Sequence, residues 1–353
     1  MRLELDRIFE VVKEHRASDV ILVAGLPPTL WILGRMTVST LEPLAPQDIE
    51  ATFLPLLDDV QREQFNRTGD IDFAVGKKNY GRLRINLHRQ RGSLSAAIRF
   101  VTQEIPTFEQ LNLPPRVRDF ATLPQGLVLV TGAAAMGKST TLAAMIDYMN
   151  RTYTYHIVTL EDPIEYMFQH QKSVIEQREI GLDSVSFGSA LRHVVRQRPD
   201  VVLIGEMRDL ETVSAALTAV ETGHLVLATL HTSSAVQTVD RIIDIFPAAQ
   251  QAQVRVQLSS CLQGITCQRL FRDALNHALV PAAEILVPTQ AIRRAIRDGE
   301  THLLTSMIET GKTLGMQTMD MAMSDLVRTG RINAQDAVLF AQDPEKMRRH
   351  LAA

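Results

Sequence analysis

Cysteine is almost absent from this sequence, which contains only two, Cys261 and Cys267, in the apolar run SSCLQGITC. Their spacing fits neither a CxxC redox motif nor a zinc-binding arrangement, so a disulfide framework and a cysteine zinc site are excluded. We interpret both as small buried hydrophobic residues of a protein in a reducing compartment.

Long hydrophobic runs and a strong excess of one charge are absent as well. No stretch approaches the roughly 20 apolar residues of a membrane-spanning helix, and the opening MRLELDRIFEVVKEHRASD is charged throughout, unlike a secretory signal. The formal net charge of −3 provides no strong attraction for DNA or RNA. We therefore expect a cytoplasmic protein with no transmembrane segment and no direct nucleic-acid binding.

The chain has 353 residues, 45% of them hydrophobic, which is enough for two domains with full-sized cores. A helical period over 2–16, a strand at 20–24 and alternating residues over 71–101 predict an α+β first domain at 1–104. The next segment, 105–118, contains three prolines and no sustained periodicity. We therefore expect it to be the linker to a second domain.

The second domain, expected at 119–353, alternates apolar strands with helices. The strands are GLVLVTG, YHIVTLED, VVLIGE and HLVLATLH, and helices are expected between them, for example over 186–196 and 210–222. Strands of this kind predict an α/β fold with a mostly parallel sheet covered on both faces. From about 248 onward we expect a mainly helical C-terminal region.

The most specific local signal fits the phosphate-loop pattern G-x-x-x-x-G-K-[ST] between a predicted strand and a predicted helix. It consists of Gly132, Ala133, Ala134, Ala135, Met136, Gly137, Lys138, Ser139 and Thr140. Backbone N–H groups of such a loop, and the N-terminus of the following helix, bind phosphates. Lys138 is then expected to reach the β- and γ-phosphates, and the Ser139 hydroxyl to ligate Mg²⁺. The sequence thus predicts a site for ATP with Mg²⁺.

The phosphate loop carries Ala135 where many such loops have glycine. If the backbone needs a positive φ at this position, the Cβ atom costs on the order of 1 kcal/mol. Because the formal pattern is kept, we expect nucleotide binding to survive, while the extent of turnover stays open.

Carboxylates follow two of the predicted strands. Glu161, Asp162 and Glu165 close one strand, and Glu206 closes another. Ligands of open α/β sheets bind at the carboxyl ends of strands, where these groups could hold a metal and activate water. The alternative is that they cap solvated turns.

Two histidines, His224 and His231, flank the predicted strand HLVLATLH. They are either polar caps or, at the carboxyl end of the strand, a sensor of the γ-phosphate. A metal site is less favoured because the sequence suggests no third ligand nearby.

Several further motifs follow one another in order along nearly the whole chain: ASDVILVAGLPP, VTLEDPIEY, REIG, RPDVVLIGEMRDLET, ETGHLVLATLHT, DRIIDIFP, AIRRAIRDGE and GMQTMD. This set resembles the secretion ATPases of type II/IV systems, and most closely the pilus retraction ATPases. The resemblance implies a PAS-like N-terminal domain and a RecA-like ATPase domain. The absence of a paired CxxC zinc site disfavours the related pilus extension ATPases.

The resemblance also implies roles for individual residues. The Walker A residues are matched by Lys138 and Ser139. The aspartate box is matched by Glu161, Asp162 and Glu165, with Glu165 as general base. Glu206 matches the Walker B glutamate at the metal site, and the histidine box is matched by His224 and His231. Arg84 and Arg99 match a region that reaches nucleotide across a subunit boundary, or are ordinary exposed strand charges. Arg293 and Arg297 lie in a motif that the resemblance links to retraction.

The family pattern further implies a homohexamer that works at the inner-membrane pilus machine with a platform protein, and also with other pilus ATPases.

The sequence departs from the family pattern at five positions. Ala134, Ala135 and Met136 depart from the usual loop, and Gln197 and Arg198 replace two usual acidic residues. An accessory ATPase that depends on a primary motor, a non-hydrolysing nucleotide-binding scaffold and a nucleic-acid translocase stay open as alternatives.

Overall fold

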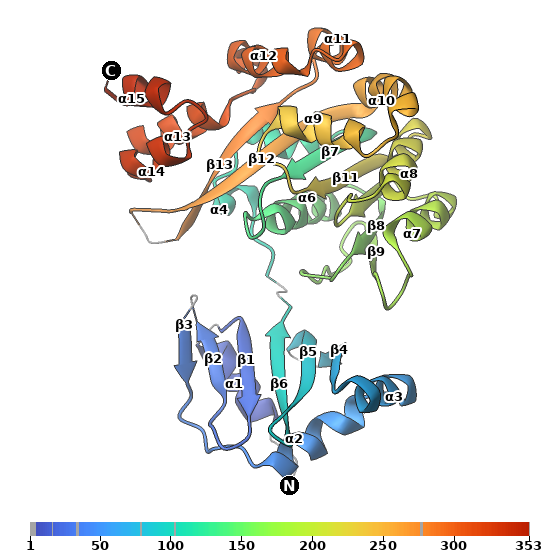
Figure 1. Ribbon diagram of the computed structural model, residues 1–353, viewed down its shortest axis with the longest axis vertical. Coiled ribbons are helices and arrows are strands. Elements are labelled where there is room, and N and C mark those ends of the chain that lie inside the picture. The colour runs from blue at the N-terminus through green and yellow to red at the C-terminus, as the bar shows by residue number, and fades with distance from the viewer. Residues whose placement is uncertain are drawn as a thin grey trace. The chain divides into compact units, whose positions relative to one another are not determined.

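The computed structural model describes residues 5–15, 17–32, 35–77, 80–101, 104–275 and 278–352. It divides the chain into two compact units, an N-terminal unit at 1–103 and a C-terminal unit at 104–353. Each unit has its own sheet and its own core (Figure 1). No helix in the described part of the chain is long and apolar enough to cross a membrane.

The N-terminal unit contains a six-stranded sheet in the order β3-β2-β1-β6-β5-β4, paired antiparallel throughout. Its strands are β1 (Asp19–Val23), β2 (Thr29–Ile32), β3 (Arg35–Val38), β4 (Asp70–Lys77), β5 (Gly81–Gln90) and β6 (Ser93–Phe100). Its helices are α1 (Leu5–Glu14), α2 (Pro46–Phe53), η1 (Leu54–Leu56) and α3 (Asp59–Thr68).

Alternation along β5 builds the core of this unit. Leu83, Ile85 and Leu87 are buried in one cluster with Phe9 of α1 and Phe53 of α2. Residues between them are less buried, as expected for a sheet with one covered face. The helix predicted over 2–16 is α1, and the ends of that prediction, 2–4 and 16, lie outside the described residues.

The C-terminal unit contains a seven-stranded sheet in the order β13-β12-β7-β11-β10-β8-β9. Its strands are β7 (Gly126–Thr131), β8 (His156–Glu161), β9 (Val174–Glu179), β10 (Val201–Ile204), β11 (Leu225–Leu230), β12 (Leu262–Arg272) and β13 (Leu279–Leu286). All neighbours are parallel except β12 and β13, which form an antiparallel hairpin. This is the α/β fold that the sequence predicts.

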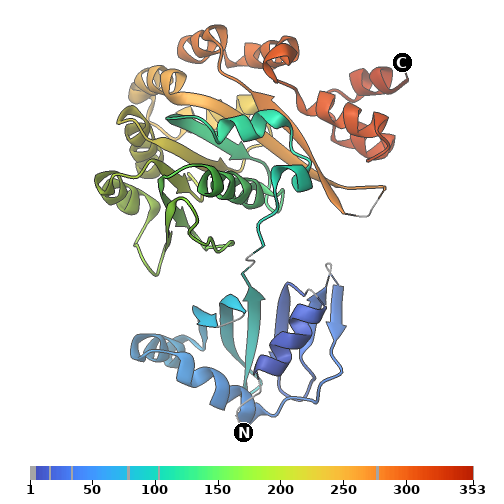
Figure 2. The same cartoon turned by 180° about the vertical axis from the view of Figure 1, so that it is seen from behind.

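Helices cover both faces of this sheet (Figure 2). They are α4 (Phe108–Leu111), α5 (Pro115–Phe120), α6 (Lys138–Thr152), α7 (Phe187–Val194), η2 (Val195–Gln197), α8 (Leu210–Glu221), α9 (Ala235–Asp244) and α10 (Ala248–Cys261). Every residue of β7 is buried. Val128 and Val130 belong to the core that contains α6, whereas Leu127 and Leu129 belong to the core of α7–α10. The strand is apolar throughout because each of its faces meets a helical layer.

The segment expected to be a linker, 105–118, differs from that expectation because it contains α4 and most of α5. Phe108 and Val117 are buried in the same core as α6. The prolines do not interrupt α5: Pro115 is its first residue, where the missing N–H has no helical partner to lose. The prolines therefore start a helix of the C-terminal unit.

The C-terminal region is also less helical than expected, because β12 and β13 follow α10. Gly264 of β12 shows how tightly this strand packs, since a Cβ atom there would lie 2.4 Å from the Phe120 ring. The helical part begins later and comprises α11 (Gln290–Asp298), η3 (Thr301–Leu303), α12 (Leu304–Thr310), η4 (Lys312–Leu314), α13 (Met319–Arg328), α14 (Ala334–Phe340) and α15 (Pro344–Ala352).

Both cysteines lie in the interior of this unit as free thiols. Burial raises the pKa of Cys261 to about 11 and that of Cys267 still further. The interpretation of both as buried hydrophobic residues is confirmed.

Candidate functional site

The loop between β7 and α6 adopts a backbone that needs its glycines. Gly132 has φ +146° and Gly137 has φ +79°. A Cβ atom on Gly132 would lie 2.5 Å from the carbonyl oxygen of Gln268 on β12, so no larger residue fits. The loop then leads directly into α6, which begins at Lys138. Its backbone geometry suits the binding of phosphate by N–H groups.

Ala135 has φ +61°, in the left-handed region. The backbone therefore has a positive φ at this position, and a residue with a Cβ atom occupies a place that favours glycine. The expected cost is about 1 kcal/mol.

Lys138 is buried at the start of α6, and its ammonium group faces the loop. Its Nζ donates to the carbonyl oxygens of Gly132 and Ala133, each at 2.9 Å, and lies 3.4 Å from Nδ1 of His231. Desolvation lowers the pKa of Lys138, although the charges of Glu206 and Glu165 oppose this shift. The carbonyl oxygens of the loop thus hold the lysine in place.

Glu206, at the carboxyl end of β10, is bonded through both carboxylate oxygens. Oε1 pairs with Nε of Arg208 at 2.5 Å, and Oε2 pairs with Nε2 of His231 at 3.1 Å. Burial alone would raise the pKa of Glu206, but Arg208 and His231 together outweigh it, so the pKa lies below its ordinary value. Glu206 is therefore an ionised group between two partners.

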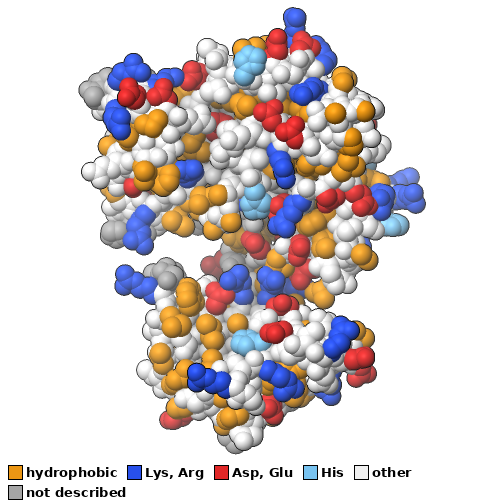
Figure 3. All heavy atoms as spheres, viewed as in Figure 1, with side chains coloured by type: hydrophobic (Ala, Val, Ile, Leu, Met, Phe, Trp, Pro, Cys, Tyr) orange, Lys and Arg blue, Asp and Glu red, His pale blue; other side chains and the backbone are white. Residues whose placement is uncertain are grey.

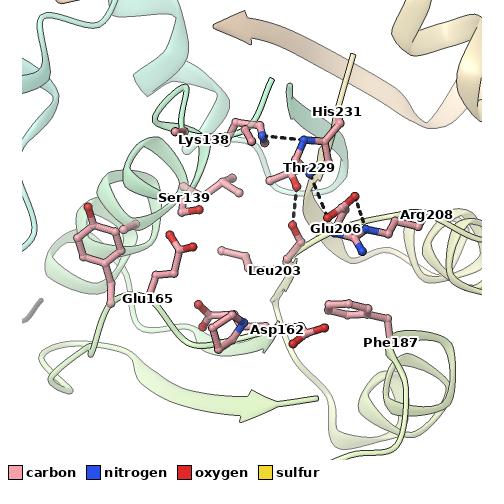
Figure 4. A pocket seen from close by; sticks show the side chains of 18 of the residues that line it. Lys138, Ser139, Asp162, Glu165, Phe187, Leu203, Glu206, Arg208, Thr229 and His231 are labelled. Atoms are coloured by element: carbon pink, nitrogen blue, oxygen red, sulfur yellow. Dashed lines mark hydrogen bonds and ion pairs between the residues drawn. The ribbon is translucent and has the colours of Figure 1, made fainter. Parts of the chain in front are cut away.

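These groups line a cavity of about 270 Å³ at the carboxyl ends of β8, β10 and β11. Ser139 and Glu165 lie close together on one side of it, and Glu206 and His231 lie on the other (Figure 4). The predicted residues that line it are Ala134, Ala135, Lys138, Ser139, Glu161, Asp162, Glu165, Glu206 and His231. The fold thus brings together side chains that come from four separate strand ends.

Glu161 lines the cavity but has its carboxylate engaged by neighbours. Its Oε1 accepts from Thr159 Oγ1 at 2.6 Å and from Gln177 Nε2 at 3.2 Å. Burial raises its pKa, against the effect of these hydrogen bonds. Glu165, by contrast, is exposed in the cavity.

Other residues of the predicted loop support it without lining the cavity. Thr140 Oγ1 lies 2.8 Å from the Tyr166 hydroxyl. The sulfur of Met136 accepts from the backbone N–H of Leu270 on β12 at 3.3 Å. Met136 therefore attaches the loop to β12.

His224 is placed away from the cavity, which differs from its expected role at the nucleotide. It precedes β11, whereas His231 follows that strand, so the two histidines lie at opposite edges of the parallel sheet. His224 Nδ1 lies 2.8 Å from the Ala219 carbonyl oxygen and 3.1 Å from Thr222 Oγ1, at the end of α8. Within this chain, His224 has the contacts of a polar cap.

Arg84 and Arg99 lie in the N-terminal unit, directly opposite each other on β5 and β6. Arg99 Nε pairs with Asp19 Oδ1 at 2.7 Å, while 64% of its side chain is exposed. Neither arginine lines the cavity of the C-terminal unit.

Sequence reasoning missed several residues that line the cavity, among them Tyr166, Phe187, Arg208 and Thr229. Arg208 could have been found, because it follows Glu206 by two positions in the same strand-end loop. Thr229 belongs to the apolar strand β11, and its hydroxyl donates to the Gly205 carbonyl oxygen at 2.5 Å.

No cluster of three or more His, Cys, Asp or Glu side chains that could hold a metal ion occurs in the described ranges. Mg²⁺ is usually bound by one or two carboxylates together with substrate phosphates. The Ser139 hydroxyl and the carboxylates of Asp162 and Glu165 are oxygen donors that face one space.

Comparison with known proteins agrees with this geometry. Residues 69–293 match the family described as type II/IV secretion system protein. The chain is 41% identical to the type IV pilus retraction ATPase PilT of Pseudomonas aeruginosa, over 97% of this chain and 99% of that one. It is 38% identical to the type IV pilus ATPase PilU of the same organism, over 98% and 91% respectively.

A solved structure of the pilus retraction motor PilT with bound ADP superposes with a TM-score of 0.89 at 44% identity, covering 97% of this chain and 99% of that one. The ATPase DotB of Legionella pneumophila superposes with a TM-score of 0.78 at 25% identity, over 95% and 94%. The chain therefore belongs to the type II/IV secretion system protein family, in its PilT/PilU-like group of pilus retraction ATPases.

Proposed function

We propose that this chain is an ATP-hydrolysing motor subunit that powers the retraction of type IV pili. One observation carries the proposal: Lys138, Ser139, Glu165 and the Glu206–His231 pair converge on one cavity in a chain that matches PilT over almost its whole length. The solved PilT structure contains bound ADP, which supports nucleotide binding by this chain.

In this proposal the phosphates bind at the loop between β7 and α6. The backbone N–H groups of 133–139 and the N-terminus of α6 supply partial positive charge, and Lys138 supplies a full one. Lys138 already lies beside Gly132 and Ala133, so little rearrangement is needed for its ammonium group to reach a β- or γ-phosphate.

Mg²⁺ would neutralise charge that develops on the phosphates. The Ser139 hydroxyl is the donor best placed to hold it, and the carboxylates of Asp162 and Glu165 face the same space. Glu206 is also a proposed ligand, since each of its oxygens keeps a second lone pair beside the one that pairs with Arg208 or His231. We assign Glu206 the role of holding His231 and Arg208 beside the metal site.

Glu165 is the group that would orient or deprotonate the attacking water. Its carboxylate is exposed in the cavity, whereas Oε1 of the less exposed Glu161 accepts from both Thr159 and Gln177. A general base needs a free lone pair within reach of the proton that it accepts. The two neighbouring glutamates therefore have different proposed roles, with Glu161 supporting the strand end.

The chain would act as a homohexamer, in which arginines stabilise phosphate charge across a subunit boundary. Arg84 and Arg99 are the candidates, since they form one paired basic site on the surface of the N-terminal unit. His224, on the edge of the sheet away from the cavity, would also act at such a boundary. The proposed partners are a platform protein of the inner-membrane pilus machine and other pilus ATPases, with the motor on the cytoplasmic side.

A nucleic-acid translocase is the less favoured alternative. On the face of the C-terminal unit shown in Figure 3, basic side chains are interspersed with acidic ones. Such a surface does not provide the continuous basic track that binds a nucleic-acid backbone.

Pulling force in a piliated strain tests the function directly. The chain would be expressed in a strain whose own retraction ATPases are deleted, beside an E165Q variant. Retraction restored by the wild-type chain and not by E165Q supports a primary motor. Retraction that appears only when a primary motor is also present assigns the accessory role, and retraction in neither case contradicts the proposal.

A further inference from the structure

Glu284 of β13 is a buried carboxylate outside the nucleotide cavity, with 2% of its surface exposed. Its Oε1 accepts from the backbone N–H of Ala235 at 2.6 Å, and its Oε2 is directed at that of Met319 at 3.4 Å. Ala235 is the first residue of α9 and Met319 the first residue of α13. One side chain therefore joins the N-termini of two helices that are far apart in the sequence.

This arrangement is more than ordinary helix capping. Each helix already has its own cap, because Ser234 accepts from the Gln237 N–H and Thr318 accepts from the Met321 N–H. Within the described residues no lysine or arginine forms an ion pair with Glu284; two helix N-termini face its carboxyl group instead. Burial raises its pKa, and the two backbone N–H groups oppose that shift.

On one side, Glu284 holds the segment that carries His231. Only three residues, 232–234, separate His231 from the start of α9. Thr232 Oγ1 also lies 2.7 Å from Thr238 Oγ1, which fastens this short connection to the first turns of α9. Because the connection is short, the position of α9 determines where the His231 ring can lie in the cavity.

On the other side, Glu284 holds the C-terminal helices. Met319 and Met323 of α13 are buried in one cluster with Ala337 of α14 and Met347 of α15. This cluster includes Phe271 and Val280 of the β12–β13 hairpin, so the helices pack on the hairpin that carries Glu284. A change in the packing of α13 would alter the contact of Met319 with Oε2, and so the position of the carboxylate whose Oε1 binds α9.

We infer that Glu284 is a positioning residue that couples the packing of α13–α15 to the placement of His231 at the terminal phosphate. The inference rests on the proposed function, because it assigns a use to the histidine of that site. It predicts that the preference for ATP over ADP depends on a carboxylate that touches neither nucleotide.

The test is the ratio of the dissociation constants for ADP and for a non-hydrolysable ATP analogue, measured with Mg²⁺ on the full chain. The variant is E284Q, which keeps the size of the side chain but presents an NH₂ group to one of two N–H donors. The matched control is D147N. Asp147 is a second buried carboxylate, and its ion-pair partner Arg151, at 2.8 Å, belongs to the same helix, α6.

We expect E284Q to reduce the preference for the ATP analogue by about fivefold, the effect of one lost hydrogen bond, with ADP binding unchanged. D147N should keep the wild-type ratio even where it lowers the melting temperature. An unchanged ratio in E284Q, or equal changes in both variants, would overturn the inference while leaving the proposed function intact. Failure of the wild-type chain to bind either nucleotide would contradict the proposed function and the inference with it.

Discussion

His231 lies between Lys138 and Glu206, with its Nδ1 atom 3.4 Å from Lys138 Nζ and its Nε2 atom 3.1 Å from Glu206 Oε2. An ammonium group offers only donors, so Nδ1 must accept and Nε2 must carry the proton that goes to Glu206. The carboxylate thus fixes the tautomer of a histidine that lies beside the phosphate-binding lysine.

We predict that H231A lowers the turnover number about 10- to 100-fold and changes the affinity for ADP little, because its ring acts at the terminal phosphate. Steady-state phosphate release and an ADP titration measure the two effects. H156A is the control, since His156 begins β8 at the opposite edge of the sheet and pairs with Glu176. Equal losses in both variants would show that His231 has no special role in turnover.

A second prediction concerns backbone strain in the phosphate loop. A135G removes a Cβ atom from a residue with φ +61°, whereas A134G changes a neighbour that is not among the positive-φ residues. A134G should be less stable than wild type because glycine has more conformational freedom in the unfolded chain. The free energy of unfolding of A135G should be about 1 kcal/mol higher than that of A134G, because A135G also relieves the strained backbone. Urea unfolding of both variants gives the difference. A135G equal to or less stable than A134G would show that the left-handed backbone carries no cost here.

The pH dependence of stability provides a third prediction. The pKa of Glu161 is raised in the folded chain. The contribution of this group to the free energy of unfolding is therefore complete below the ordinary carboxyl pKa, and it is lost as the pH rises through the pKa of the folded chain. E161Q stays neutral at every pH. The stability of E161Q relative to wild type should therefore increase from pH 5 to pH 7.5, as urea unfolding at both values would measure. A difference that is the same at both pH values would contradict the assignment.

A fourth prediction concerns Met136, which departs from the usual family loop. M136L keeps the volume but removes the sulfur that accepts from the Leu270 N–H. The loss of this weak acceptor should cost about 0.5–1 kcal/mol of stability and raise the KM for ATP. M149L, a change of the same kind at a buried position of α6, is the control. A KM that is unchanged in M136L would show that the contact with β12 does not position the loop.

Much of the site could be predicted from sequence because its parts are local. The phosphate loop is contiguous, and Glu165, Glu206 and His231 each follow an apolar strand, so a parallel sheet brings them to one edge. The same argument should have separated His224 from His231, since a strand has its two ends at opposite edges.

What the sequence could not reveal depends on tertiary contacts. β12 mixes polar residues such as Gln268 with apolar ones, and its strand conformation follows from pairing with β7 and β13. The arginine partner of Glu206 and the bridge made by Glu284 arise from side chains that meet only after folding. The prolines of 105–118 favour a linker in the sequence, whereas Pro115 begins α5, a short helix held by packing against the core of α6.

Magnesium-dependent phosphate release by the purified chain, measured beside K138A and E165Q, tests the central claim most directly. Turnover in the wild-type chain that is abolished in both variants, with ADP binding retained by E165Q, is the result that this account predicts. Nucleotide binding without turnover in the wild-type chain, or turnover that survives E165Q, would contradict it.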